Sequence, residues 1–258
     1  MNGLTLFDNA FSPFARKVRM VLEYKGLAFE TVDGLHSRGR EALAAVNPRR
    51  EVPVLVDGST VVVNSSHIIA YLEDAHPAPT VMPGDPAARA RIRHWERLAD
   101  THLDAIVVDV SLWSWAHRDD EPPAGLREAA ARDLDAIYAR LEEALGHGGE
   151  FLCGPFSLAD IALFPNLYAT RTLQLGPDPA RHPRTMAWLK GLARLPLFQA
   201  DLARVRACLA SFKDDPGFER ERIFWRGDRI EWLLANGFHR WFLQEIEQGR
   251  VLWPGTTT

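Results

Sequence analysis

Hydrophobic positions over the first eighty residues switch between the two spacings expected of strands and helices. Short β-rich runs, typical of strands, cover residues 4–7, 28–32, 52–56 and 60–63. Apolar residues at helical spacing cover residues 14–24, 38–46 and 65–75. The sequence Asp57-Gly58-Ser59 between the last two β-rich runs is a strong hairpin signal. The pattern therefore predicts the order β-α-β-α-β-β-α.

A proline-rich linker follows this α/β region. Four prolines fall within the eleven residues 76–86, which is typical of a connection between domains. Helical spacing dominates beyond the linker, over residues 87–116, 126–145, 157 onward, 185–192 and 197–212. We therefore expect two domains, an α/β domain at residues 1–78 and an all-helical domain at residues 87–258.

Composition narrows the classes of partner and cofactor. A chain of 258 residues with 47% hydrophobic residues can bury a large core. A net charge of −4 predicts no nucleic-acid partner, and no apolar run approaches the roughly 18 residues of a membrane span.

The start of the chain reads as a strand and not as a secretion signal. Cys153 and Cys208 lack metal or redox spacing and are expected to be small core residues, and the nine histidines are scattered. We expect no metal site and a reduced, cytoplasmic protein.

Ser12 and Pro13 stand where the first strand gives way to the first helix. Serine favours the N-cap position and proline the first helical position, so a helix beginning here is expected. Free backbone N–H groups and the helix dipole favour an anion at such a site, and a thiolate is an anion. The plainer interpretation is a capped helix alone. Since residues 12–15 read Ser-Pro-Phe-Ala and contain no cysteine, disulfide exchange is not expected.

Four segments together resemble the cytosolic glutathione transferases over roughly residues 3–212. They are residues 12–19 (SPFARKVR), 52–55 (VPVL), 64–72 (NSSHIIAYL) and 157–160 (SLAD). The last of these also approximates a helix capping box. The resemblance implies a thioredoxin-like first domain, an all-helical second domain and a homodimer.

The resemblance also implies a glutathione site in the first domain. Ser12 would stabilise the thiolate, and Val52 would pair with the tripeptide backbone beside a cis Pro53. Asn64 and Ser65 would hold the γ-glutamyl end, with Ser65 capping the third helix. Relatives carry an acid or glutamine where this chain has Asn64.

The glycine carboxylate of glutathione requires a cation, for which Arg38 and Arg50 are the candidates. His36, Arg40 and Arg49 lie in the same loops. Many relatives carry lysine where this chain has Glu51. Charged runs of this kind are typical of solvated faces.

The resemblance places a hydrophobic electrophile between the Ser12 loop and the helices after the linker. Phe11, Phe14, Trp113 and Trp115 are the candidate lining residues, although aromatic residues at helical spacing are also typical of a core. Residues 217–258 contain four of the eight tryptophans and suggest amphipathic helices broken near Asn236-Gly237. This extension either packs on the helical domain or covers the electrophile site.

The expected function is attack of the glutathione sulfur on a hydrophobic electrophile, as in detoxification. Conjugation, reductive dehalogenation, ether cleavage and cis–trans isomerisation all remain open. Isomerase relatives carry a Ser-Ser-Cys run that is absent here. Two alternatives are a non-catalytic binding or assembly protein and a carrier of hydrophobic ligands. Asn64 and Glu51, which depart from the family pattern, keep the first alternative open.

Overall fold

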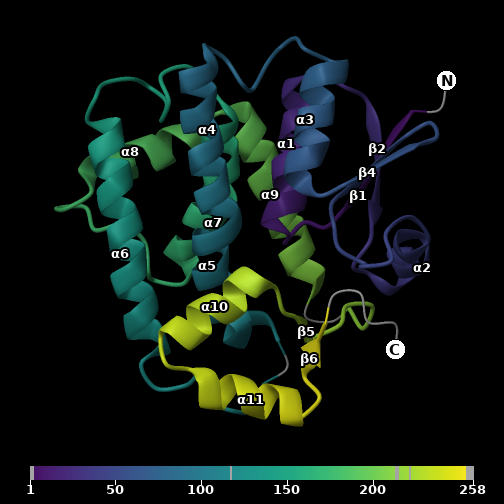
Figure 1. The fold of residues 1–258 in the computed structure, drawn as a ribbon, viewed down its shortest axis with the longest axis vertical. Helices are drawn as coiled ribbons and strands as arrows, with labels where there is room; N and C mark the ends of the chain where they lie inside the picture. The colour runs from purple at the N-terminus through teal and green to yellow at the C-terminus, as the bar shows by residue number, and fades with distance from the viewer. Residues whose placement is uncertain (1–2, 117, 213–214, 221, 254–258) are drawn as a thin grey trace.

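The structure is a computed structural model that describes residues 3–116, 118–212, 215–220 and 222–253. Its first part contains a mixed sheet (Figure 1), whose four strands have the order β2-β1-β3-β4. The strands are β1 (Leu4–Asp8), β2 (Phe29–Asp33), β3 (Val54–Asp57) and β4 (Thr60–Val63). β1 runs parallel to β2 and antiparallel to β3, and β3 and β4 form the predicted hairpin. The predicted order is confirmed, with strand ends shifted by one or two residues.

Three helices cover the two faces of this sheet. They are α1 (Pro13–Tyr24), α2 (Ser37–Val46) and α3 (Ser65–Ala75). Successive strand residues point to opposite faces. Leu6 accordingly packs with the apolar faces of α1 and α3, while Phe7 packs with Leu43 of α2. The result is a thioredoxin-like arrangement, as expected.

The second part is helical. Its helices are α4 (Pro86–Leu98), η1 (Ala99–Leu103), α5 (Asp104–Trp115), α6 (Leu126–Leu145), α7 (Leu158–Thr172), α8 (Pro183–Leu192) and α9 (Pro196–Phe212). The single long helix expected at residues 87–116 is continuous, but its middle turn η1 is π-helical. The capping box at the start of α7 is confirmed: Ser157 and Asp160 exchange side-chain and backbone hydrogen bonds.

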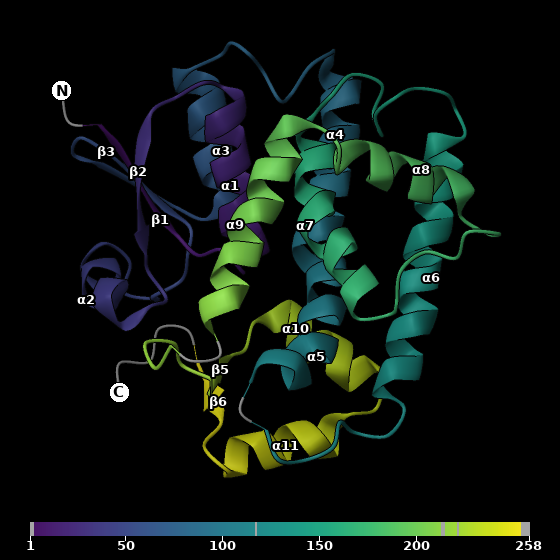
Figure 2. The same ribbon diagram turned by 180° about the vertical axis from the view of Figure 1, so that it is seen from behind.

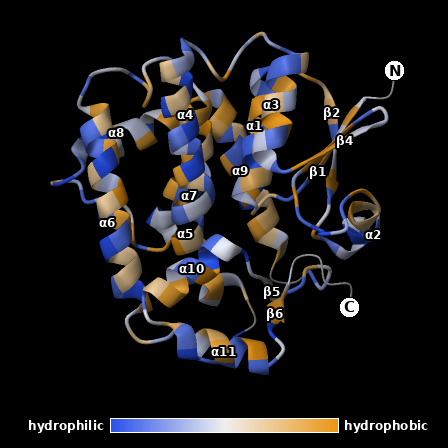
Figure 3. Ribbon diagram, viewed as in Figure 1, coloured by the Kyte–Doolittle hydropathy of each residue, from blue (hydrophilic) through white to orange (hydrophobic). Residues whose placement is uncertain are grey.

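The extension forms four short elements at one end of the helical part (Figure 2). They are β5 (Ile223–Phe224), α10 (Gly227–Ala235), α11 (His239–Glu247) and β6 (Val251–Leu252). The predicted break at Asn236-Gly237 is confirmed, and α10 and α11 carry both hydrophobic and hydrophilic residues (Figure 3). The parallel pairing of β5 with β6 was not predicted, because two-residue strands leave no periodicity.

Ion pairs join α1 to α9 across the two parts of the chain. Arg16 contacts Asp201 at 2.5 Å, and Arg19 contacts it at 3.1 Å. Arg19 also pairs with Asp8 at the end of β1. All four side chains are buried, so these charges fix α9 against the first domain.

The described residues contain neither a membrane-spanning helix nor a metal-binding cluster. No helix there is both long and apolar enough to span a bilayer. Nor does any group of three histidine, cysteine or acidic side chains there have the arrangement needed to hold a metal ion.

Candidate functional site

Four loops meet at one edge of the sheet because of the strand directions. The residue pairs Phe7–Val54 and Val54–Val63 place the end of β1, the start of β3 and the end of β4 side by side. The parallel pair Asp8–Asp33 adds the end of β2. The segments carrying Ser12, Val52, Asn64 and Arg38 follow or precede these strand ends. The fold therefore gathers the predicted glutathione-binding segments at a single edge.

Ser12 is the N-cap of α1, as predicted. Its Oγ accepts a hydrogen bond of 3.3 Å from the Ala15 N–H, and Pro13 is the first helical residue. The loop before it is held by Asn9, whose side chain donates to Asp33 and accepts from the Phe11 N–H. Toward the other described residues Ser12 Oγ acts only as an acceptor, so its half-buried O–H can still donate to an anion at the start of the helix.

The Val52–Pro53 peptide bond is cis, which confirms the prediction, and Pro53 is buried. A second cis bond, Ala78–Pro79, lies in the linker. Among the residues described, no hydrogen-bond partner is seen for the N–H or C=O of Val52. An unpaired strand-like backbone of this kind can accept an added peptide strand.

Ser65 does not cap α3, which corrects the prediction. Asn64 is the N-cap, with φ of 76° and its Oδ1 accepting a 3.1 Å hydrogen bond from the Ser66 N–H. Asparagine tolerates this left-handed backbone and is a strong capping residue. Ser65 is instead the first residue of α3 and is 4% exposed. The capping role of Asn64 occupies its side-chain oxygen.

The start of α3 is also tied to the helical part by a charge cluster that sequence reasoning missed. Lys17 Nζ lies 2.9 Å from Glu96 and 2.6 Å from Asp100, and Ser66 Oγ donates to Glu96 at 3.0 Å. Burial raises the pKa of Asp100, against the lowering effect of Lys17. These residues lie on α1, α3, α4 and η1, and no local motif links positions so far apart in the chain.

The two candidate arginines are both exposed. Arg38 lies in the first turn of α2, and its N–H donates to the His36 ring at 3.1 Å. Arg50 has φ of 54° in the loop before Val52. Its neighbour Arg49 is engaged by Glu51 at 2.8 Å. Arg38 lines an open cavity of about 440 Å³, together with Val32, Asp33, His36, Gly39, Cys208, Ser211, Asp215 and Phe218.

The four candidate electrophile-site aromatics divide into two pairs. Phe11 packs edge-on against Phe212 at the end of α9, with centroids 4.8 Å apart, and Phe14 lies under the guanidinium of Arg226 at 4.3 Å. Both flank Ser12. Trp113 instead packs against Trp241 of α11, and the Trp115 Nε1–H donates to Ser111 Oγ.

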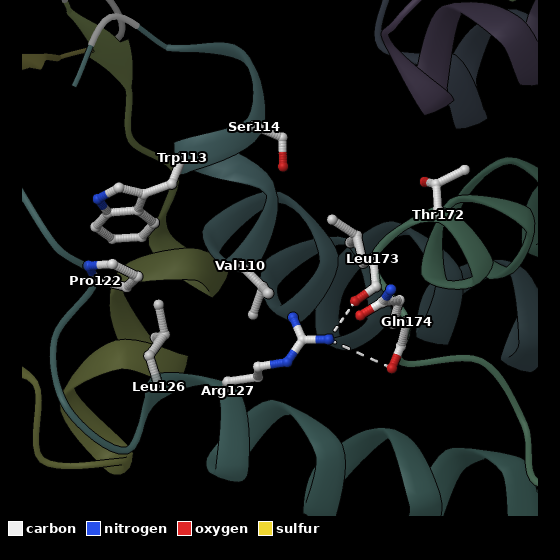
Figure 4. Close-up of a pocket in the computed structure, with 9 residues that line it drawn as sticks. All are labelled: Val110, Trp113, Ser114, Pro122, Leu126, Arg127, Thr172, Leu173 and Gln174. Carbon is white, nitrogen blue, oxygen red and sulfur yellow. Dashed lines mark hydrogen bonds between the residues drawn. The ribbon is translucent and has the colours of Figure 1, made fainter. Parts of the chain in front are cut away.

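Trp113 faces a separate pocket of about 320 Å³ at the junction of α5, α6 and α7 (Figure 4). There Arg127 donates to the backbone carbonyls of Leu173 and Gln174. None of the residues lining that pocket belongs to the Ser12 loop.

Residues 215–220 and 222–226, which lead into the extension and form its first part, are called the strap; they pass from the first domain to the helical part. At one end the Ser37 N–H donates to the Gly217 carbonyl at 2.9 Å, and the His36 ring contacts Phe218 and Asp215. At the other end Arg226 contacts Phe14 of α1 and donates to the Asp100 carbonyl of η1 at 3.5 Å. No motif marks Arg226 in the sequence, and through these contacts the strap joins both parts of the molecule.

The cysteines have the chemistry of unreactive thiols. Burial raises the pKa of Cys153 to about 11 and also raises that of Cys208. Cys153 packs against the core, but Cys208 is a half-buried lining residue of the cavity beside Arg38 and not a core residue. It lies there because this face of α9 is turned toward the end of β2.

Comparisons with known proteins agree with this architecture. Residues 6–80 match the profile of the glutathione S-transferase N-terminal domain, and residues 124–191 match that of the C-terminal domain. A maleylacetoacetate isomerase of Pseudomonas aeruginosa is 31% identical over 186 residues, covering 68% of this chain and 85% of the relative.

Solved structures show the same fold. A glutathione S-transferase of Rhodospirillum rubrum is 25% identical, with a TM-score of 0.67 over 77% of this chain and 91% of that one. Ure2p5 of Phanerochaete chrysosporium, solved with 1-(S-glutathionyl)-2,4-dinitrobenzene, is 21% identical, with a TM-score of 0.67 over 81% and 97%. On the two profile matches and these likenesses, this chain belongs to the glutathione S-transferase family.

Proposed function

We propose that this protein is a glutathione transferase that activates the thiolate for attack on a hydrophobic electrophile. One observation carries the proposal: the Ser12 hydroxyl, the unpaired backbone of Val52 and the start of α3 lie at one edge of the sheet. An extended tripeptide could pair with Val52, beside cis Pro53, and reach Ser12 with its sulfur and Ser65 with its γ-glutamyl carboxylate. Asn64 would help to hold the γ-glutamyl end.

The energetics of such a site are sufficient without a general base. A free thiol has a pKa near 8.5, and lowering it by about two units requires about 2.7 kcal/mol of preferential thiolate stabilisation. A charge-assisted hydrogen bond supplies about 1.5–3 kcal/mol and a helix N-terminus about 0.3–1 kcal/mol. Ser12 at the start of α1 offers both.

The remaining assignments follow the same proposal. Residues 1–78 form the glutathione-binding domain, in which Arg38 or Arg50 receives the glycine carboxylate. Residues 87–258, with the extension at 217–258, complete the electrophile site beside Phe11 and Phe14. Trp113 and Trp115 would contribute to the electrophile site only indirectly, because among the described residues no ring contact or hydrogen bond joins them to the Ser12 loop. The protein acts as a cytoplasmic homodimer, as its family membership suggests, and light scattering can test the dimer.

Two single-atom deletions test the proposal. Ser12→Ala should leave glutathione affinity within about twofold but return the pKa of the bound thiol toward 8.5, which lowers thiolate content and turnover near pH 7 by at least about tenfold. Ser65→Ala should instead weaken glutathione binding by roughly tenfold, because the γ-glutamyl carboxylate loses the buried hydroxyl that would donate a hydrogen bond to it. Calorimetry measures the affinities, and the ultraviolet absorbance of the thiolate gives the pKa. An unchanged thiol pKa in Ser12→Ala would contradict the proposed role.

A binding or assembly protein without catalysis is the second candidate. Asn64 favours it, because the side-chain oxygen already serves as the cap of α3 and is less available to a substrate amino group. A binding protein of this kind should show no glutathione-dependent turnover with any electrophile. A panel of aryl halides, epoxides, aryl ethers and maleyl acids separates the two and identifies the reaction.

A further inference from the structure

Arg226 lies directly beside the proposed reaction centre. Its guanidinium carbon stands 4.3 Å from the centroid of the Phe14 ring, and Phe14 is the second residue of α1, two positions after Ser12. The preceding residue, Trp225, is buried, and α10 begins immediately after Arg226. The strap therefore delivers one cation to the helix start where the sulfur would be activated.

The hydrogen-bonding capacity of Arg226 is largely unused. Among the described residues, its contacts are a 3.5 Å hydrogen bond to the Asp100 carbonyl and carboxylates of Asp104 and Asp228, each at 3.7 Å. Good charge-assisted hydrogen bonds are about 2.7–2.9 Å long, and a guanidinium has five donors. The side chain is 33% exposed, so a ligand can reach it.

The described groups around this guanidinium hold it without short hydrogen bonds. The cation–π contact with Phe14 helps to position the guanidinium. Asp104 is buried behind it, while Asp228 also faces Arg97 at 3.8 Å. Lys17 of α1 is already engaged by Glu96 and Asp100. Arg226, which lies against Phe14, therefore keeps N–H donors for a ligand among its contacts to described residues.

We propose that Arg226 selects electrophiles that carry a carboxylate, which it binds through two N–H groups while the thiolate attacks. The inference rests on the proposed transferase function. An electrophile close enough to be attacked beside Ser12 lies next to Phe14, within reach of the guanidinium above that ring. A planar carboxylate matches the arginine fork, and its shorter hydrogen bonds would outcompete the 3.7 Å contacts to Asp104 and Asp228.

Two stable product-like ligands test this selection without requiring turnover. Calorimetry would compare S-(4-carboxybenzyl)glutathione with S-benzylglutathione, which differ only in the carboxylate. The wild-type protein should bind the carboxylated conjugate about tenfold more tightly. Arg226→Gln should abolish this preference while changing the affinity for S-benzylglutathione by less than twofold, and Arg226→Lys should retain part of it.

Arg97→Gln is the matched control, because it removes an exposed arginine that faces the same Asp228 and should leave the preference intact. Equal affinities of the wild type for the two conjugates would overturn the inference, whether or not the variants fold. So would an equal loss of both ligands in Arg226→Gln, which indicates a structural role. In both cases the transferase proposal still stands if the wild-type protein binds S-benzylglutathione. Absence of binding by glutathione and both conjugates would remove both proposals.

Discussion

Asp109 shows how a single buried acid ties the extension to the helical domain. It lies on α5, and Arg229 of α10 donates to its Oδ1 at 2.8 Å. Burial raises the pKa of Asp109 to about 7, against the lowering effect of Arg229, and raises that of its neighbour Asp104 to about 6. Because both values exceed the ordinary carboxyl pKa near 3.9, the folded state holds these protons more tightly than the unfolded chain.

This linkage predicts a pH-dependent stability. The contribution of Asp109 is fully present below about pH 4 and is lost as the pH rises toward the folded pKa of about 7. The free energy of unfolding of Asp109→Asn, which cannot ionise, should therefore fall less between pH 5 and pH 8 than that of the wild type. Urea titrations at several pH values measure both slopes. Parallel slopes in the two proteins would contradict this assignment.

At the scale of elements, the extension adds contacts on both domains around the proposed site. Its strap contacts His36 and Ser37 at the start of α2, and Arg226 at its far end contacts Phe14, while Trp232 and Leu233 of α10 are buried in the helical core. Packing of the extension on the helical domain is therefore confirmed. Covering of the electrophile site, a lid role, stays a prediction that the contact of Arg226 with Phe14 supports.

Removal of residues 217–258 should change substrate preference and leave glutathione affinity within about threefold, because the predicted tripeptide-binding residues all lie before the extension. Relative rates with small and bulky aryl electrophiles measure the preference, and calorimetry measures the affinity. Since the truncation exposes apolar surface, circular dichroism must first show a cooperative melt. A folded truncated protein with the same substrate profile would contradict the lid role.

Across the whole molecule, local signals predicted the fold well and the site in part. Asp57-Gly58 predicted the β3–β4 hairpin, and Ser12-Pro13 predicted the start of α1, because both effects act within a few residues. The helix cap was assigned to Ser65 and not to Asn64, since both residue types favour caps and only the backbone at Asn64 distinguishes them. Arg226 over Phe14 was not predictable, because the two residues are brought together only by tertiary packing.

The α1–α9 ion pairs couple the two domains and give a stability prediction at this scale. Asp201→Ala leaves Arg16 and Arg19 buried with too little compensating charge, which should cost about 3–5 kcal/mol of unfolding free energy. Arg204→Ala is the matched control, because it breaks the more exposed pair with Glu23 at the same interface and should cost at most about 1 kcal/mol. Urea denaturation measures both, and equal losses would contradict the difference in burial.

The pairing of β5 with β6 has a practical consequence for anyone handling this protein. Leu252, near the last described position, hydrogen-bonds through its carbonyl to the Trp225 N–H, one residue before Arg226. Leu4 begins β1 at the opposite edge of the sheet from Ser12. An affinity tag or fusion partner therefore belongs at the amino terminus, since cargo attached behind Leu252 would strain the β5–β6 pairing beside Arg226 and the proposed reaction centre.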